Sequence, residues 1–442
     1  MPSAGERMRL SYVAADRSVA LTADTVGSAL RAVATSAPDA PGLVEGHPDP
    51  ACRRRWTFAQ LLEESERIAR VLAARFAPGE HVAVWASSTP EWVLLEFAAA
   101  LAGVVLVTVN PALQPQELEY VLTQSAAVGL FYERSYRGNA MERHLDSVRP
   151  RLADLRETIP MDELGALPAS TNGAALPDVE PRSPAQLQYT SGTTGLPKGA
   201  LLPHAGIVNN ARLTMELVGM PPGGVYLNCM PLFHTGGCVL GVLGPLQRQS
   251  ASVCMRQFDP GLFLELCEAE GVTHLLAVPT MLIAAMEHES FGRRDLSSLQ
   301  VVFSGGAPVP DELVRRIERQ LGVEFSILFG QTEAAPVITM TRPGDSAEDK
   351  ATTLGTVIPH VEVKIVDPAT GDTVPTGTSG ELCARGFNVM LGYHDMPDKT
   401  AETIDADGWL HTGDLATMDD RGYFRIAGRL RDIILLQCIV EK

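Results

Sequence analysis

Short apolar strands alternate with amphipathic helices through the first two thirds of the chain. A helical pattern that begins at Thr57-Phe58 and runs to about Arg75 is followed by the apolar strand His81–Trp85. Parallel strands need crossover connections, which helices supply. The alternation therefore predicts parallel-rich sheets with helices on both faces. Further helices are predicted at 91–102, 115–122, 258–270 and 311–321, and further strands at 104–109, 128–132, 186–189, 272–278, 299–303 and 324–328.

The pattern changes after about Thr341. From there on, apolar and polar side chains alternate with a period of two, and segments rich in Pro, Gly and Thr separate the apolar runs. Period-two strands joined by tight turns are typical of an antiparallel unit. We therefore expect a small barrel-like unit here, with strands at 361–366, 380–385, 415–418 and 423–427.

A chain of 442 residues exceeds what one hydrophobic core usually supports. We predict an α/β core at residues 1–340, divided into two subdomains whose boundary the sequence does not fix. A β-barrel-like subdomain is expected at 341–430, followed by a short remainder at 431–442.

The charge balance bears on the partners that the chain can have. There are 53 acidic and 36 basic residues, so the net charge is −17, and nucleic-acid binding, which needs a basic footprint, is not expected. The first ten residues lack the apolar core of a signal peptide. The longest uninterrupted apolar run, 97–107, is too short to span a bilayer. We expect a cytoplasmic protein with no transmembrane segment; peripheral membrane contact and oligomeric state stay open.

The seven cysteines are scattered, and no two of them form a C-x-x-C pair. This pattern favours free thiols in a reducing compartment over a disulfide framework. No pair of Cys or His residues has the usual spacing of zinc ligands, so the sequence predicts no metal site made from them.

Residues 189–199 have the sequence YTSGTTGLPKG. Glycines let backbone N–H groups approach a phosphate closely, hydroxyls donate hydrogen bonds, and a lysine adds a positive charge. A Walker A loop has Gly directly before its lysine, whereas Pro197 precedes Lys198 here. The segment therefore predicts a phosphate-binding loop of another kind, made of Thr190, Ser191, Gly192, Thr193, Thr194, Gly195 and Lys198.

This loop resembles the phosphate loop of the adenylate-forming (AMP-binding) enzyme superfamily, and three further segments of that family follow in order. They are FGQTE at 329–333, GWLHTGD at 408–414 and GRLRD at 428–432. The segments SGGAPV, at 304–309, and Asn110-Pro-Ala-Leu bring the chain near the fatty-acyl and medium-chain acyl-CoA synthetases. The resemblance implies the large N-terminal body of such an enzyme: two parallel-rich sheets in an αβαβα arrangement plus a small distorted β-barrel.

The reaction that the resemblance implies uses ATP, Mg²⁺ and CoA. A fatty-acid carboxylate attacks the α-phosphate of ATP, pyrophosphate leaves, and the acyl-adenylate passes its acyl group to CoA. Two anions must meet, so oriented donors and positive charge are the main catalytic need. By resemblance, the loop hydroxyls and Lys198 hold the β- and γ-phosphates, Thr332 donates to the α-phosphate, and Glu333 ligates Mg²⁺.

The resemblance also implies residues for the nucleoside. The carboxylate of Asp414 would accept both ribose hydroxyls, and Arg429 would add a ribose or phosphate contact. The ring of Phe329 would stack on the adenine. The other residues expected around the nucleotide are Gly305, Gly306, Ala307, Gly330 and Gln331.

His234 is the expected gate of the acyl pocket, beside the reacting carboxylate. The segment that follows it, 235–244, is apolar or glycine-rich and suits a hydrocarbon tail. Peptide-synthetase relatives place an aspartate near here for an amino group, and Phe233-His234-Thr235 offers no acid. The resemblance thus implies fatty-acid metabolism, with chain length open and an aryl-acid:CoA ligase as an alternative.

The resemblance ends at about Ile434, where the family continues into a small C-terminal lid that supplies a second lysine. We expect residues 1–442 to lack that lid and to be impaired as an enzyme. A catalytically silent module that binds ATP or an acyl-adenylate is therefore a second alternative.

Overall fold

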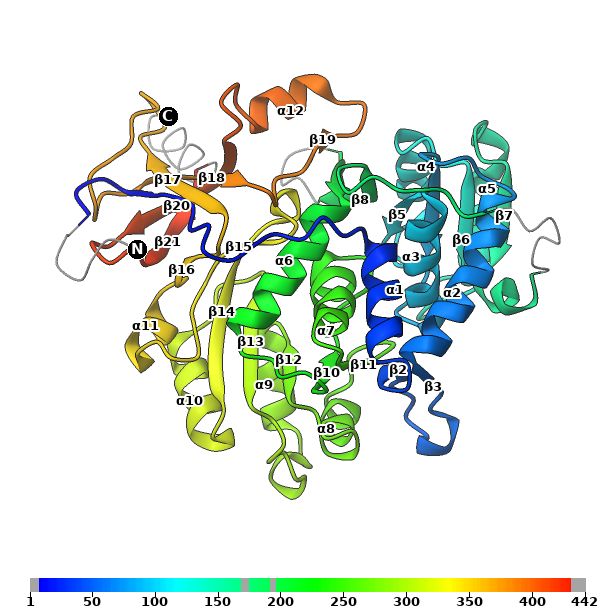
Figure 1. Cartoon of the computed structure of the whole chain (residues 1–442), viewed down its shortest axis with the longest axis horizontal. Coiled ribbons are helices and arrows are strands. Elements are labelled where there is room, and N and C mark those ends of the chain that lie inside the picture. Colours follow the sequence, from blue (N-terminus) through cyan, green and yellow to red (C-terminus); the bar gives the residue numbers. More distant parts are fainter. Residues whose placement is uncertain (1–7, 168–174, 191–195, 431–442) are drawn as a thin grey trace.

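The computed structural model describes residues 8–167, 175–190 and 196–430 and contains three sheets (Figure 1). The largest sheet has nine strands, and neighbours from β2 through β14 run parallel. The parallel-rich sheet expected from the alternation is therefore confirmed. In spatial order its strands are β16 (Thr356–Val357), β15 (Val337–Met340), β14 (Glu324–Gly330), β13 (Val301–Gly305), β12 (His274–Leu276), β10 (Val225–Asn228), β11 (Ala251–Cys254), β2 (Pro41–Glu45) and β3 (Arg55–Thr57).

The second sheet has seven strands and is parallel except at β9 and β19. These two antiparallel strands lie at the edge that carries the expected phosphate loop. In spatial order the strands are β19 (Gly392–Tyr393), β9 (Lys198–Pro203), β8 (Pro184–Thr190), β5 (Val105–Val109), β4 (His81–Trp85), β6 (Gly129–Tyr132) and β7 (Glu157–Pro160).

A layer of helices lies between these two sheets. The same buried apolar cluster contains Leu43 of β2 and Val84 of β4, from opposite sheets, together with Leu95 and Ile207 from the helices between them. Burial of apolar area on both faces of a helix layer is the main stabilising contribution in such a stack. The layer comprises α1 (Val26–Ser36), α2 (Phe58–Ala73), α3 (Pro90–Ala102), α6 (His204–Leu217), η4 (Gly236–Leu243) and α7 (Gly244–Gln247).

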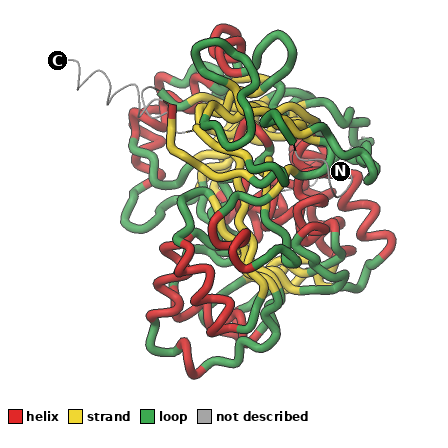
Figure 2. The backbone as a smooth tube through the Cα atoms, turned by 90° about the vertical axis from the view of Figure 1, so that its left-hand side faces the viewer, coloured by secondary structure: helices red, strands yellow, loops and turns green. Residues whose placement is uncertain are grey.

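Two outer helix layers complete the expected αβαβα stack, with strands flanked by helices in the rotated view (Figure 2). On the nine-stranded sheet they are α8 (Pro260–Ala269), α9 (Pro279–Glu287), α10 (Asp311–Leu321) and α11 (Ala347–Thr352). On the seven-stranded sheet they are α4 (Pro115–Gln124) and α5 (Met141–Val148). Short helical turns lie at Pro50–Cys52, Arg149–Arg151, Met161–Ala166, Phe291–Arg293 and η6 (Thr332–Ala334), and α12 (Pro397–Thr403) follows β19.

The barrel-like unit expected after residue 341 is a five-stranded antiparallel sheet at one end of the molecule (Figure 1). Its order is β1 (Tyr12–Val13), β17 (Val361–Val366), β18 (Gly380–Gly386), β20 (Leu410–Met418) and β21 (Phe424–Arg429). Strand β1 comes from the start of the chain, while β16 and β19 belong to the two large sheets. The division of the chain at residue 340 stays a prediction.

Local sequence explains where several elements begin and end. Helix α3 begins after Thr89, whose side chain accepts a hydrogen bond from the Trp92 N–H, and carries Pro90 in its first turn. It ends at Gly103, which has a φ of 71°, a conformation that glycine adopts without steric cost. Helix α8 begins at Pro260 rather than 258 because Asp259 caps it.

In the described part of the chain, every helix is too short or too polar to cross a membrane. The six cysteines described are free thiols, and all of them except Cys52 are buried.

Candidate functional site

The two ends of the expected phosphate loop are adjacent strand ends. Thr190 closes β8 and Lys198 opens β9, and the two residues are opposite each other in the antiparallel pair. The loop residues Ser191, Gly192, Thr193, Thr194 and Gly195 lie outside the described residues, and their expected role stays a prediction.

Tyr393 joins the loop lysine to the expected metal ligand. The ammonium of Lys198 donates to the Tyr393 hydroxyl at 2.9 Å, and that hydroxyl donates to Oε1 of Glu333 at 2.7 Å. The Lys198 Nζ also lies 4.0 Å from the centroid of the Tyr393 ring. Glu333 is 9% exposed, so this hydrogen bond stabilises a carboxylate that is largely removed from water.

The sequence alone did not identify Tyr393 as a site residue. It lies on the two-residue strand β19, whose Tyr393 pairs with Ala200 of β9. Because nothing in the local sequence predicts that pairing, no periodicity or spacing relates Tyr393 to Lys198 or to Glu333.

Two buried asparagines hold the turn that carries Thr332 and Glu333. The side-chain amide of Asn388 donates to the carbonyls of Ala334 and Val337, both at 3.0 Å. Asn210 of α6 donates to the Val337 carbonyl at 2.9 Å and accepts from the Val337 N–H at 3.1 Å. These bonds satisfy backbone groups that would otherwise be buried without partners. No sequence pattern pointed to either asparagine.

Gly330 shapes the same turn. The register of β14 against β15 shifts between Phe329 and Gly330, and a Cβ on Gly330 would lie 1.9 Å from the Pro336 carbonyl oxygen. Only glycine permits this approach of the two strands. Gln331 follows, and its N–H donates to that carbonyl at 2.9 Å. The close approach of the two strands therefore requires glycine at position 330 of the segment FGQTE.

The expected adenine residues lie at the ends of adjacent strands. Gly305 ends β13 opposite Leu328 of β14, one residue before Phe329. Phe329 is half-buried and packs against the core cluster of the antiparallel sheet, whereas Gly306 and Ala307 are exposed. The structure thus brings Gly305 and Phe329 to the same edge of the sheet, where Phe329 also has a packing role.

The expected ribose residues pair across the antiparallel sheet. Asp414 of β20 lies opposite Arg429 of β21, and Nε of Arg429 is 3.2 Å from Oδ1 of Asp414. Burial raises the pKa of Asp414, Arg429 offsets part of the rise, and the carboxylates of Glu381 and Glu333 add to it. The structure thus places the two expected ribose residues side by side.

His234 lies just before η4. Its carbonyl accepts hydrogen bonds from the N–H groups of Gly237 and Cys238, and its ring centroid lies 4.3 Å from that of Phe233. The residue keeps solvent access, yet surrounding protein desolvates the imidazole and lowers its pKa. The ring is therefore neutral at pH 7.

The apolar side chains after His234 pack in the core. Val239, Leu240, Val242 and Leu243 of η4 are all buried in the clusters between the sheets. A packing role thus explains their hydrophobicity, and their expected contact with a hydrocarbon tail stays a prediction.

A cavity of about 670 Å³ opens on the side of Phe233. Its lining includes Asn110 and Pro111 at the end of β5, and Arg137 and His144 from the segment around the start of α5. The lining combines these polar and basic groups with apolar side chains such as Pro231 and Phe233, so its composition does not identify it as the acyl site.

Comparisons with known proteins agree on one family. A family profile described as AMP-binding enzyme matches residues 30–394. The protein YngI of Bacillus subtilis strain 168 is 38% identical in an alignment of 441 positions that covers 93% of this chain and 80% of YngI. The mitochondrial medium-chain acyl-CoA ligase ACSF2 of Homo sapiens is 33% identical, over 96% of this chain and 74% of that protein. Among solved structures, the inhibitor-bound N-terminal domain of FACL13 from Mycobacterium tuberculosis has a TM-score of 0.82 at 26% identity, over 92% of this chain and 100% of that domain.

The shared role of the two asparagines generates a prediction about stability. Asn388→Ala leaves buried carbonyls short of a donor, and we expect it to lower the free energy of unfolding by about 1–3 kcal/mol. Asn210→Ala should cost a similar amount. Because both side chains donate to the Val337 carbonyl, the double variant should depart from additivity by at least about 0.5 kcal/mol. Denaturant unfolding of the four proteins measures this coupling, and additive effects would contradict a shared clamp.

Proposed function

The chain belongs to the AMP-binding enzyme family, and on that basis we propose that it is an AMP-forming acyl-CoA ligase that activates a fatty acid with ATP and Mg²⁺ and transfers it to CoA. The observation that carries the proposal is the hydrogen-bonded series Lys198–Tyr393–Glu333, together with the Asp414–Arg429 pair of the antiparallel sheet. Together these residues offer a cation for phosphate, a carboxylate for a metal and a carboxylate for ribose.

In the proposed first step, a carboxylate oxygen of the fatty acid attacks the α-phosphorus of ATP. The bond from that phosphorus to the bridging oxygen breaks, and pyrophosphate leaves with the electron pair. Lys198 neutralises charge on the departing phosphates, and Thr332 donates to the α-phosphate. Because these groups are fixed before the reaction, little reorganisation accompanies the development of charge.

The residues present fit Mg²⁺ at one position. Glu333 is a buried carboxylate whose Oε1 already accepts from Tyr393, and its second oxygen is a suitable ligand for a hard cation. When bound, Mg²⁺ supplies charge neutralisation at the phosphates. Tyr393 orients the carboxylate, and Asp414 and Arg429 orient the ribose.

In the proposed second step, the sulfur of CoA attacks the acyl carbon and AMP leaves. Human ACSF2 is named as a medium-chain acyl-CoA ligase, and this likeness supports a medium-chain fatty acid as the substrate. His234 is the proposed gate of the acyl site. As a neutral ring, it can lie beside a carboxylate or an apolar chain without bringing a charge of its own.

Substitution of Tyr393 tests the proposed metal position. Tyr393→Phe removes the hydroxyl that joins Lys198 to Glu333 but keeps the ring. We expect the Mg²⁺ concentration at half-maximal pyrophosphate release to rise by roughly tenfold, because a hydrogen bond to a charged group contributes about 1.5–3 kcal/mol. Mg²⁺ titrations at saturating ATP and decanoate measure it.

Tyr423→Phe is the matched control for this experiment. The Tyr423 hydroxyl also donates to a carboxylate, Oδ1 of Asp345 at 2.8 Å, but it lies outside the proposed site. The control should leave the Mg²⁺ dependence unchanged. An equal shift in both variants would show that lost stability, not lost positioning, accounts for the Tyr393 result.

Turnover can be measured on a polypeptide of residues 1–442 alone. We propose that it releases pyrophosphate slowly with decanoate and forms decanoyl-CoA poorly, since the family resemblance places a further cation and the CoA channel in a lid beyond the matched span. By analogy with the loss of one oxyanion donor, adding the C-terminal domain of YngI should raise adenylate formation by about 10²–10³-fold.

Parallel assays of pyrophosphate and thioester test this proposal. Lys198→Ala in the extended protein should lower both rates. Equal thioester rates with and without the added domain would contradict the proposed need for a lid, while leaving the nucleotide site untested by that comparison.

A further inference from the structure

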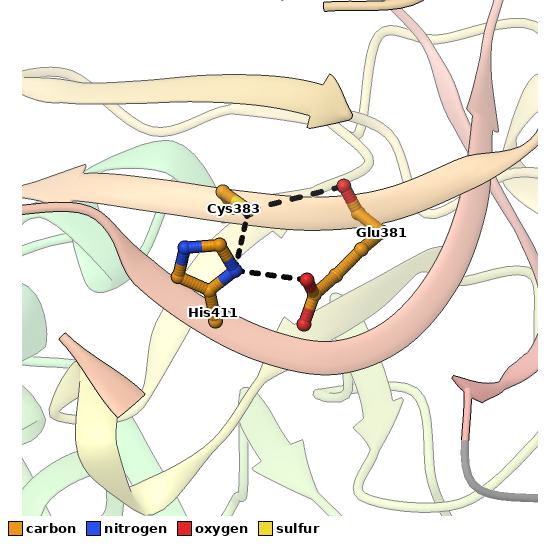
Figure 3. Close-up of side chains that lie close together, drawn as sticks. All are labelled: Glu381, Cys383 and His411. Carbon is orange, nitrogen blue, oxygen red and sulfur yellow. Dashed lines mark hydrogen bonds and ion pairs between the residues drawn. The ribbon is translucent and has the colours of Figure 1, made fainter. Parts of the chain in front are cut away.

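Three side chains of the kinds that bind transition metals meet on the antiparallel sheet (Figure 3). Glu381 and Cys383 lie two residues apart on β18, and His411 of β20 is the register partner of Cys383. Their donor atoms all lie within 4.8 Å of one another. The sequence analysis predicted no metal site from Cys and His because 28 positions separate Cys383 from His411. The pairing of β18 with β20 brings the two residues together in space.

A register shift brings the carboxylate into the group. Glu381 pairs with Leu415 and Cys383 pairs with His411, so three residues of β20, 412–414, lie opposite Leu382 alone. This irregularity lets the Glu381 side chain reach back to His411, as the close-up shows (Figure 3). Bulges of this kind often redirect side chains at functional positions.

We propose that Glu381, Cys383 and His411 form a binding site for a thiophilic divalent cation, with Zn²⁺ as the natural ligand. Thiolate, imidazole and carboxylate together are a zinc-type donor set. The site is distinct from the proposed Mg²⁺ ligand Glu333, a hard-cation position that offers no sulfur.

The geometry fits a tetrahedral ion closely for two of the three ligands. The Sγ of Cys383 lies 3.5 Å from Nδ1 of His411, and about 3.5 Å separates these atoms when both bind one tetrahedral Zn²⁺ at ordinary bond lengths. Nδ1 lies 2.8 Å from Oε2 of Glu381, which is a hydrogen-bond distance. The carboxylate must therefore move outward by about half an ångström to become a ligand.

Neighbouring groups orient the ligands. Nε2 of His411 lies 3.7 Å from Oδ2 of Asp405, so a carboxylate faces the ring nitrogen that would not bind the ion, as is usual for metal-binding histidines. The Gly413 N–H donates to Oε1 of Glu381 at 3.0 Å, which fixes the other end of that carboxylate.

Charge and access also permit binding. Lys364 of β17 is the register partner of Cys383 on its other side. The carboxylates of Glu381 and Asp405, both beside His411, outnumber that one cation, so a divalent ion is not repelled. Cys383 and Glu381 are buried, whereas the His411 side chain is 32% exposed and gives the route from solvent.

The test uses the full chain, stripped of metal, with Cd²⁺ as the spectroscopic probe and Zn²⁺ as the competitor. We expect a cadmium–thiolate charge-transfer band that titrates to one equivalent and disappears when Zn²⁺ is added. The band should be lost in Cys383→Ser, and Zn²⁺ affinity by calorimetry should fall at least about tenfold in His411→Gln and in Glu381→Gln. Cys52→Ser, which removes the exposed thiol, should leave the band intact.

The absence of a band in the native chain would overturn the proposal. A band that survives in a folded Cys383→Ser variant would overturn it as well. If Cys383→Ser fails to fold, His411→Gln decides the question, because that side chain is partly exposed and its loss opens no buried cavity. Unchanged Zn²⁺ affinity in a folded His411→Gln variant would also contradict the site.

Discussion

The hydrogen bonds from Lys198 through Tyr393 to Glu333 connect parts of the chain that the fold brings together only at the edge of the seven-stranded sheet. Lys198 opens β9, Tyr393 lies on β19 beside it, and Glu333 belongs to the turn after β14 of the other large sheet. A buried carboxylate is costly unless it is hydrogen-bonded, so the position of Glu333 depends on Tyr393. The proposed metal position in turn depends on the hydrogen bonds that connect Glu333 to Lys198 through Tyr393.

The surrounding scaffold makes this arrangement rigid. Asn210 comes from the helix layer between the sheets, and Asn388 comes from the segment between β18 and β19. Both side chains donate to the turn that carries Thr332 and Glu333. The helix layer and the segment after β18 therefore both hold that turn in place. Such support fixes functional side chains before a substrate binds, which is a requirement for catalysis by positioning.

Sequence patterns predicted most of the fold because the elements concerned satisfy local rules. The helix at 311–321 and the strands at 81–85 and 361–366 were predicted with the bounds that the structure has. The loop pattern predicted Lys198, and the family resemblance implied Glu333, Asp414 and Arg429 as candidates. The structure connects Lys198 to Glu333 through Tyr393 and pairs Asp414 with Arg429. That outcome supports the family's arrangement of the site, while each residue's role stays a proposal.

What the sequence did not reveal depends on contacts between distant residues. Tyr393 lies on a two-residue strand, and Asn210 and Asn388 are single polar residues in apolar surroundings. The group of Glu381, Cys383 and His411 arises from strand register, which no spacing of Cys and His encodes. The apolar run of η4 was expected to suit a hydrocarbon tail, and its side chains are buried in the core, which the sequence did not predict.

The most direct test of the central claim is calorimetric binding of a non-hydrolysable decanoyl-adenylate analogue, 5′-O-(N-decanoylsulfamoyl)adenosine. The analogue presents nucleoside and acyl chain to one site at the same time. The account predicts binding to the chain at least about tenfold tighter than that of AMP, and a loss of about tenfold or more in Asp414→Ala, where the proposed ribose contact is missing. Absence of binding, or equal affinity of the native chain and Asp414→Ala, would contradict the proposed nucleotide site.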